Sequence, residues 1–140
     1  METWMVYALL SAVFASLTAI LAKFGLQEID ADLGNAIRTA FVFVFVTANY
    51  FLRQTSKDFS QLTSKIVGFL FLSACATALS WIFYYRAMKF GNVSYVAAID
   101  KGSIVLTILL AFLILKEPLT PKLIIGGLMV AAGLVVITLK

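Results

Sequence analysis

Residues 92–115 read NVSYVAAIDKGSIVLTILLAFLIL, and this apolar segment decides the fold. Its thirteen Val, Ile, Leu and Phe residues favour insertion into a bilayer by about 4 to 8 kcal/mol in total. Asp100 and Lys101 lie inside the segment, and two charges near the centre of a membrane helix cost about 5 to 7 kcal/mol. The free energy of inserting the isolated helix into a bilayer is therefore close to zero, so neighbouring helices or water must receive both charges.

Four further segments have the length that a helix needs to cross a bilayer. With 62% hydrophobic and only 13% charged residues, the chain is far from the composition of a soluble domain. The apolar runs are continuous rather than alternating, which favours a helical bundle over a β-barrel. We therefore expect an all-α integral membrane protein with five transmembrane helices in one domain, residues 1–140. The expected helices cover residues 4–23, 33–52, 66–86, 92–115 and 122–139.

The loop charges only weakly define an orientation in the membrane. With the N-terminus inside, the cytoplasmic side carries Arg53, Lys57, Lys65, Lys116 and Lys122, and the other side carries Lys23, Arg86, Lys89 and Lys140. Five against four is too small a bias to fix one orientation. If the chain inserts both ways, two copies can form an antiparallel homodimer, and each chain is then half of a ten-helix inverted-repeat transporter. A single orientation with a small but sufficient bias is the alternative.

Charged residues inside the segments are the leading candidates for a substrate or coupling site. At a rise of 1.5 Å per residue, Arg38 lies about 6 Å and Asp100 about 12 Å below the same membrane face. An arginine side chain can close that difference, so we predict an Arg38–Asp100 pair, with Lys23 reaching the same level from the first helix. Adjacent helical residues diverge by about 100°, so we expect Lys101 to need a different acceptor, or water.

These charges allow three interpretations. Together Arg38, Asp100 and Lys101 carry one net positive charge, which suits a substrate with an anionic group. Alternatively, Asp100 carries a coupling proton, or the charges form a permanent ion pair that fixes helix register. Trp81 and Tyr85, one helical turn apart, are further candidates for the substrate path, although a lipid-facing anchor is the favoured role of Trp81.

Small and hydroxyl residues form stripes at helical spacing. In the third segment the stripe contains Ser73, Thr77, Ser80 and Tyr84, for which helix packing is favoured over a cavity wall. In the last segment Gly127, Ala131 and Gly133 predict a close helix–helix interface, either within the chain or between subunits.

Composition also excludes several classes of function. The chain has no histidine and one cysteine, Cys75, and it contains no recognisable hydrolytic, redox or metal constellation. We therefore expect no enzyme, no metal and no cofactor. The net charge of +4 is spread over short loops, which indicates contact with the anionic head groups of the lipid bilayer rather than with nucleic acid.

Residues 84–103, YYRAMKFGNVSYVAAIDKGS, resemble the passage from the third to the fourth helix of EamA-type proteins in the drug/metabolite transporter superfamily. The turn LKEPLT at 115–120 and the glycine-bearing segment 125–133 are similar to the same family. The IDK run at 99–101 and AIRT at 36–39 are most similar to its short branch, whose members have five helices.

The resemblance implies two inverted five-helix repeats, here supplied by two chains, and transport of small metabolites or drugs, often outward. Ala98 stands where the family pattern has proline, so the fourth segment is expected to be straighter. Gly102 replaces a larger residue, which widens a cavity or loosens packing.

We therefore predict a secondary transporter, an exporter or exchanger of a small polar or amphipathic metabolite or drug. It is expected to act by alternating access as an antiparallel homodimer in a bacterial or archaeal cytoplasmic membrane. A structural or accessory subunit of a heteromeric transporter and a passive pore are the alternatives.

Overall fold

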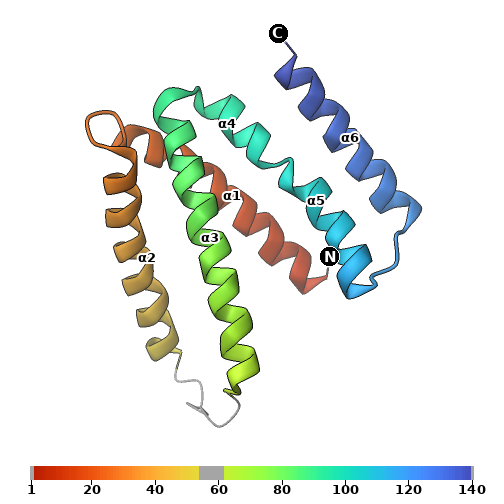
Figure 1. Ribbon diagram of the computed structural model, residues 1–140, viewed down its shortest axis with the longest axis horizontal. Helices are drawn as coiled ribbons and strands as arrows, with labels where there is room; N and C mark the ends of the chain where they lie inside the picture. Colours follow the sequence, from red (N-terminus) through yellow and green to blue (C-terminus); the bar gives the residue numbers. More distant parts are fainter. Residues whose placement is uncertain (1, 54–61, 140) are drawn as a thin grey trace. The chain divides into compact units, whose positions relative to one another are not determined.

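The computed structural model describes residues 2–53 and 62–139, and all regular structure within these residues is helical (Figure 1). The elements are α1 (Thr3–Gly25), α2 (Ala31–Leu52), α3 (Ser64–Phe90), α4 (Val93–Asp100), α5 (Ser103–Leu110), the π-helical turn η2 (Ala111–Leu115) and α6 (Pro121–Thr138). Five stretches are long and apolar enough to cross a membrane, the fourth being Val93–Leu115. The expected all-α membrane fold is confirmed. Most of the long polar connection between α2 and α3, including Lys57, lies outside the described residues. Lys140, the other residue of the charge comparison affected, lies outside them as well.

Side-chain caps fix where two of the helices begin. The Asp30 carboxylate accepts hydrogen bonds from the backbone N–H groups of Asp32 and Leu33, at 2.8 and 3.2 Å, and so starts α2. The Thr120 hydroxyl accepts from the N–H of Leu123 at 3.3 Å, and Pro121 occupies the first position of α6, where a missing N–H costs nothing.

The contacts of the chain separate into two compact units. The α2–α3 unit contains Leu21–Phe90, and in it α2 packs along α3. The α4–α6 unit contains Met1–Ile20 and Gly91–Lys140, and in it α4 and α5 pack on α6. Helix α1 contributes its first part to the α4–α6 unit and its last turn to the α2–α3 unit.

The fourth segment is interrupted at Lys101 and Gly102, between α4 and α5. Here the backbone tightens: the N–H of Gly102 bonds to the carbonyl of Ile99 at 2.9 Å, and that of Val105 to the carbonyl of Gly102 at 3.1 Å. Both are i to i+3 hydrogen bonds, typical of a 3₁₀ turn. The absence of proline at position 98 therefore does not make the segment one continuous helix.

Glycine allows α6 to approach the fourth segment closely. A Cβ atom at Gly102 would lie 2.7 Å from Leu134 Cδ2 and 2.9 Å from the carbonyl oxygen of Ile99. A Cβ at Gly127 would lie 3.2 Å from Ile108 Cδ1. Gly102 therefore tightens packing on α6, which corrects the expectation that it widens a cavity or loosens packing.

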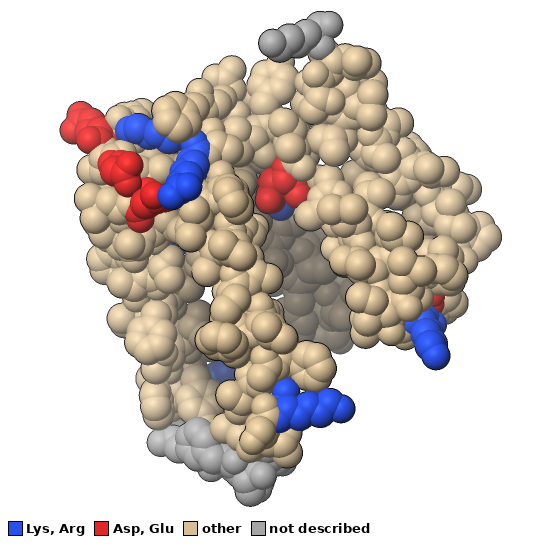
Figure 2. All heavy atoms as spheres, viewed as in Figure 1, with Lys and Arg blue, Asp and Glu red and all other residues tan. Residues whose placement is uncertain are grey.

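Few apolar side chains are buried within a single chain. Among the described residues the buried apolar ones are Ala19, Leu26, Ala31, Tyr85 and Met88, whereas most Leu, Ile, Val and Phe side chains are exposed. In the space-filling view most of this face carries no charge (Figure 2). Such a surface is stable against lipid tails or against another protomer, as expected for an integral membrane protein.

The Gly102 contact gives a stability prediction. Gly102→Ala is expected to lower the unfolding temperature of the solubilised protein, at a cost of about 1 to 3 kcal/mol, because the Ile99 carbonyl belongs to the backbone and cannot move aside easily. Gly126→Ala is the matched control, since a Cβ there meets nothing within 4 Å. It should be neutral or stabilising because alanine favours a helix over glycine. Equal unfolding temperatures for the two variants would contradict this packing.

Candidate functional site

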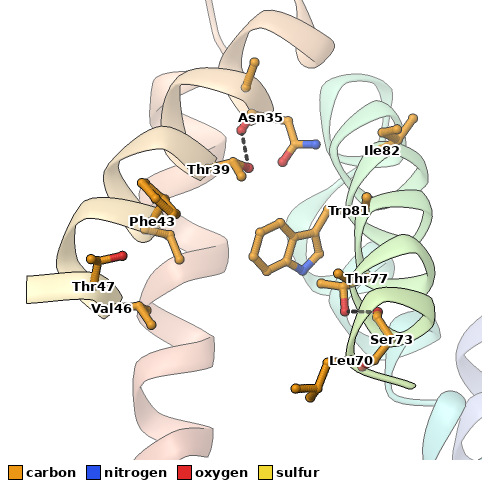
Figure 3. A pocket seen from close by; sticks show the side chains of 14 residues that line it. Asn35, Thr39, Phe43, Val46, Thr47, Leu70, Ser73, Thr77, Trp81 and Ile82 are labelled. Atoms are coloured by element: carbon orange, nitrogen blue, oxygen red, sulfur yellow. Dashed lines mark hydrogen bonds between the residues drawn. The ribbon is translucent and has the colours of Figure 1, made fainter. Parts of the chain in front are cut away.

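A groove of about 820 Å³ runs between α2 and α3 inside the α2–α3 unit. Figure 3 shows Trp81 projecting from α3 towards α2, with Asn35 and Ile82 towards one end of the groove and Leu70 and Val46 towards the other. The lining residues are Asn35, Ala36, Thr39, Val42, Phe43, Val46 and Thr47 of α2 and Leu70, Ser73, Ala74, Thr77, Ala78, Trp81 and Ile82 of α3. A concave, mostly apolar wall with a few polar groups is typical of a small-molecule site.

Two hydroxyl groups of the groove bond to their own helices. Thr39 donates to the carbonyl of Asn35 at 2.7 Å, and Thr77 donates to the carbonyl of Ser73 at 2.9 Å. Each hydroxyl proton is thus engaged within the helix, as is common for threonine in apolar helices. Ser73 and Thr77 of the third-segment stripe line the groove, whereas the sequence pattern favoured helix packing for this stripe.

Arg38 is not one of the residues that line the groove, but it contacts Trp81, which does line it. Its Cζ atom is 4.5 Å from the centroid of the Trp81 ring and 5.7 Å from that of the Tyr85 ring. A guanidinium over aromatic rings gains about 0.5 to 2 kcal/mol per contact, the larger values where water is excluded. The helix periods explain the arrangement: Asn35 and Arg38 share one face of α2, and Trp81 and Tyr85 share one face of α3. We refer to Asn35, Arg38, Trp81 and Tyr85 as the Arg38 cluster.

Three buried polar atoms of the Arg38 cluster have no hydrogen-bond partner among the described residues. They are Asn35 Oδ1, Arg38 Nη1 and the Tyr85 hydroxyl oxygen. Tyr85 is 3% exposed and Asn35 8%. Because an unsatisfied buried polar group costs about 1 to 3 kcal/mol, three of them together mark a place where a further group is needed. A bound substrate is one source of such a group.

Charged side chains join α2 and α3 at the end of the unit where α2 begins and α3 ends. Arg86 donates to both carboxylate oxygens of Asp32, from Nε at 3.0 Å and from Nη2 at 2.7 Å, and so joins the start of α2 to the end of α3. Red and blue side chains gather over these two helix ends in Figure 2. Both side chains are about half exposed, so this pair fixes geometry more than it adds stability.

Two lysines bind backbone carbonyls at the same end. Lys89 Nζ donates to the carbonyls of Leu26, Gln27 and Ile29, at 2.6, 3.1 and 2.9 Å. Lys23 Nζ donates to the carbonyl of Met88 in the last turn of α3, at 2.6 Å. A cation at a helix C-terminus is favourable because the last carbonyls carry partial negative charge. Lys23, expected near the substrate, thus has a contact that joins α1 to α3.

In the α4–α6 unit, Asp100 and Lys101 contact each other. Lys101 Nζ lies 3.4 Å from Asp100 Oδ2, and the two side chains are 59% and 38% exposed, respectively. Lys101 was expected to need its own acceptor, or water, because it diverges from Asp100, whereas in the structure Asp100 itself accepts from it. Helix α4 ends at Asp100, and the side chain of the next residue, Lys101, reaches the Asp100 carboxylate.

The other predicted residues fall in both units. Arg38 and Asp100 belong to different units, so their pairing stays a prediction. Gly127 faces Ile108 of α5, whereas Gly133 has open space around it and Ala131 is half-buried. Asn35 and Lys89 were not singled out from the sequence. Asn35 lies one helical turn before Arg38, and that spacing alone could have drawn attention to it.

Comparison with known proteins places the sequence of this chain in a family. Residues 2–139 match the EamA-like transporter family. A protein from Sinorhizobium sp., described as an uncharacterized transporter in the cobO 3′ region, is 37% identical over 132 residues, which cover 94% of each chain. No solved structure gives a significant match.

The carbonyl contacts of Lys89 can be tested by removal. Lys89→Met keeps most of the length of the side chain and should destabilise the protein by about 1 to 3 kcal/mol, because three carbonyls lose a charged donor. Lys65→Met is the control, since Lys65 is exposed in the first turn of the same helix. Thermal unfolding in detergent measures both variants. Unfolding of Lys89→Met at the temperature of the control would show that the lysine does not hold this end together.

Proposed function

This chain belongs to the EamA-like transporter family, and from that premise we propose that it is a secondary transporter that exports or exchanges a small polar or amphipathic metabolite or drug. Its family and its five membrane-length helices make it an integral membrane transporter. The substrate class, the direction of transport, the bacterial or archaeal cytoplasmic membrane and the assembly of two copies belong to the proposal.

The observation that carries the proposal is the groove between α2 and α3 with the Arg38 cluster beside it, of which Asn35 and Trp81 line the groove. It combines an apolar wall, which suits the body of a small molecule, with a cation and unpartnered polar atoms inside a membrane-length helix. Ionisable residues within such helices are costly and mark substrate or ion pathways in most membrane proteins. A molecule with an apolar and a polar part fits both halves of this site.

Two features support alternating access by an antiparallel homodimer. The fourth segment is discontinuous at Lys101–Gly102, and broken helices are a recurring element of transporter sites. Asp100 and Lys101 are also exposed on the single chain, although they lie well within a membrane-length segment. A second, inverted chain would cover these charges and supply the other five helices of the family's ten-helix arrangement.

An accessory subunit is the second candidate, and the Asp100–Lys101 contact is the observation that favours it. In an accessory subunit, two charges that bind each other would fix a helix end and have no part in transport. A larger partner would then carry out the transport. Transport by this chain alone distinguishes the two proposals.

Transport can be tested in liposomes that contain only this protein. We expect vesicles loaded with a mixture of bacterial metabolites smaller than 1 kDa to lose particular compounds faster than protein-free vesicles, as followed by mass spectrometry. Trp81→Ala should reduce this loss at least tenfold because the Trp81 ring both lines the groove and covers Arg38. Trp4→Ala, which removes an exposed tryptophan of α1, is the matched control and should keep the rate.

Saturation and counterflow complete that experiment. A carrier saturates and exchanges labelled for unlabelled substrate across the membrane, whereas a pore does neither. Loss of no compound from wild-type vesicles would favour the accessory subunit, and an unchanged rate for Trp81→Ala would remove the groove from the transport path.

The antiparallel arrangement predicts that the chain inserts in both orientations. Alkaline phosphatase, which is active outside the cytoplasm, and green fluorescent protein, which folds inside it, should both be active when fused to the C-terminus in bacterial cells. Adding two lysines after Gly25, in the α1–α2 connection, should shift all molecules to one orientation because the existing bias is so small. Activity of one reporter alone in the unmodified chain would contradict the antiparallel homodimer.

A further inference from the structure

We propose that the groove between α2 and α3 selects amphipathic organic anions over cations and neutral molecules of the same shape, with Arg38 as the selecting charge. This inference rests on the proposed function, because it assigns a chemical class to the molecule that occupies the same groove. It depends on three features of the α2–α3 unit: the charge balance around Arg38, the unpartnered donors beside it, and the composition of the wall.

Within the described part of the α2–α3 unit, no carboxylate contacts Arg38 and compensates its charge. In the described part of this unit the acids are Glu28, Asp30 and Asp32. The Asp30 carboxylate caps α2, and Asp32 binds Arg86 through both oxygens. Asp32 is also six residues from Arg38, about 9 Å along the helix axis. Within this unit, the potential is therefore positive where Asn35 and Trp81 line the groove beside Arg38.

The unpartnered donors need an acceptor. Arg38 Nη1 and the Tyr85 hydroxyl are buried without one among the described residues, and a guanidinium N–H can only donate. Aromatic faces stabilise the Arg38 charge, but they do not accept a hydrogen bond as strongly as oxygen does. A carboxylate or sulfonate oxygen is the strongest acceptor for both groups. The unpartnered Asn35 Oδ1 would additionally receive a donor close to the anionic group.

The rest of the groove requires an apolar body. Away from the Arg38 cluster its wall includes Val42, Phe43, Val46 and Leu70, and the Thr77 hydroxyl is engaged on its own helix. A small inorganic anion would leave this wall uncovered. The same cation repels an ammonium group in a region of low dielectric constant, where charges interact much more strongly than in water. An anion carried on an apolar body satisfies both parts of the groove.

Three probes with one apolar body test the selection: 3-phenylpropionate, 3-phenylpropionamide and 3-phenylpropylammonium. Their binding is measured by titration calorimetry on the protein in lipid nanodiscs at neutral pH, with empty nanodiscs of the same lipid as the blank. We expect the wild-type protein to bind the carboxylate about tenfold or more tightly than the ammonium probe, with the amide between them.

Two arginine variants locate the selecting charge. Arg38→Gln should reduce the preference for the carboxylate over the ammonium probe to about twofold or less. Arg53→Gln removes an exposed arginine just after α2 and should keep the full preference. Arg38→Lys, which keeps the charge, should retain most of it and serves if Arg38→Gln does not fold.

Each outcome has a separate meaning. Equal or tighter binding of the ammonium probe by the wild-type protein, or no binding of any probe, would overturn the anion selectivity. A carboxylate preference that survives Arg38→Gln would overturn the role assigned to Arg38. If transport in liposomes is saturable and sensitive to Trp81→Ala, the proposed function stands in either case, because that experiment does not depend on the charge of the substrate.

Discussion

The contact on which the α2–α3 unit depends is the stacking of the Arg38 guanidinium on the rings of Trp81 and Tyr85. A charge inside an apolar helix is costly unless a partner stabilises it, and the usual partner is an acid. Here the faces of the Trp81 and Tyr85 rings stabilise the Arg38 charge instead. They attract the cation electrostatically without neutralising it, so the charge is held in place and still acts on its surroundings. A carboxylate in the same position would have removed the positive potential of the groove.

This stacking requires α2 and α3 to keep one register, and the polar contacts at their shared end secure it. Lys89 binds the carbonyls that precede α2, and Arg86 binds Asp32 in its first turn. Arg38 lies about two turns further along α2. Apolar packing between two membrane helices is tolerant of sliding, because lipid tails replace lost contacts at little cost. Directional bonds at one end therefore do more to align Arg38 with Trp81 than the apolar contacts along the groove.

Sequence patterns predicted the helices well and the pairing of side chains poorly. Length and hydropathy suffice for five membrane-length helices because a bilayer imposes both on any spanning segment. Arg38, Trp81 and Tyr85 were each identified, since charge and aromatic rings stand out in apolar runs, but their mutual contact depends on how α2 and α3 rotate about their axes. Lys89 was interpreted as a loop charge because nothing in a single sequence distinguishes a solvated lysine from one that binds carbonyls. The Asp100–Lys101 contact was missed because an ideal helix was assumed where the helix ends.

The single chain stabilises its two sets of charges inside membrane-length helices, Arg38 and the Asp100–Lys101 pair, to different extents. Arg38 is half-buried, its Nη1 atom is buried, and its guanidinium lies over rings from its own chain, so the single chain already stabilises it. Within the described part of the α4–α6 unit, Asp100 and Lys101 have only each other, at 3.4 Å, and remain substantially exposed. Such a pair is compatible with water but poorly compatible with lipid tails, because each charge keeps unsatisfied hydrogen-bonding groups. Whatever covers the end of α4, whether a second copy or a water-filled space, must therefore be polar at that point. Lipid can cover most of this chain, but not this helix end.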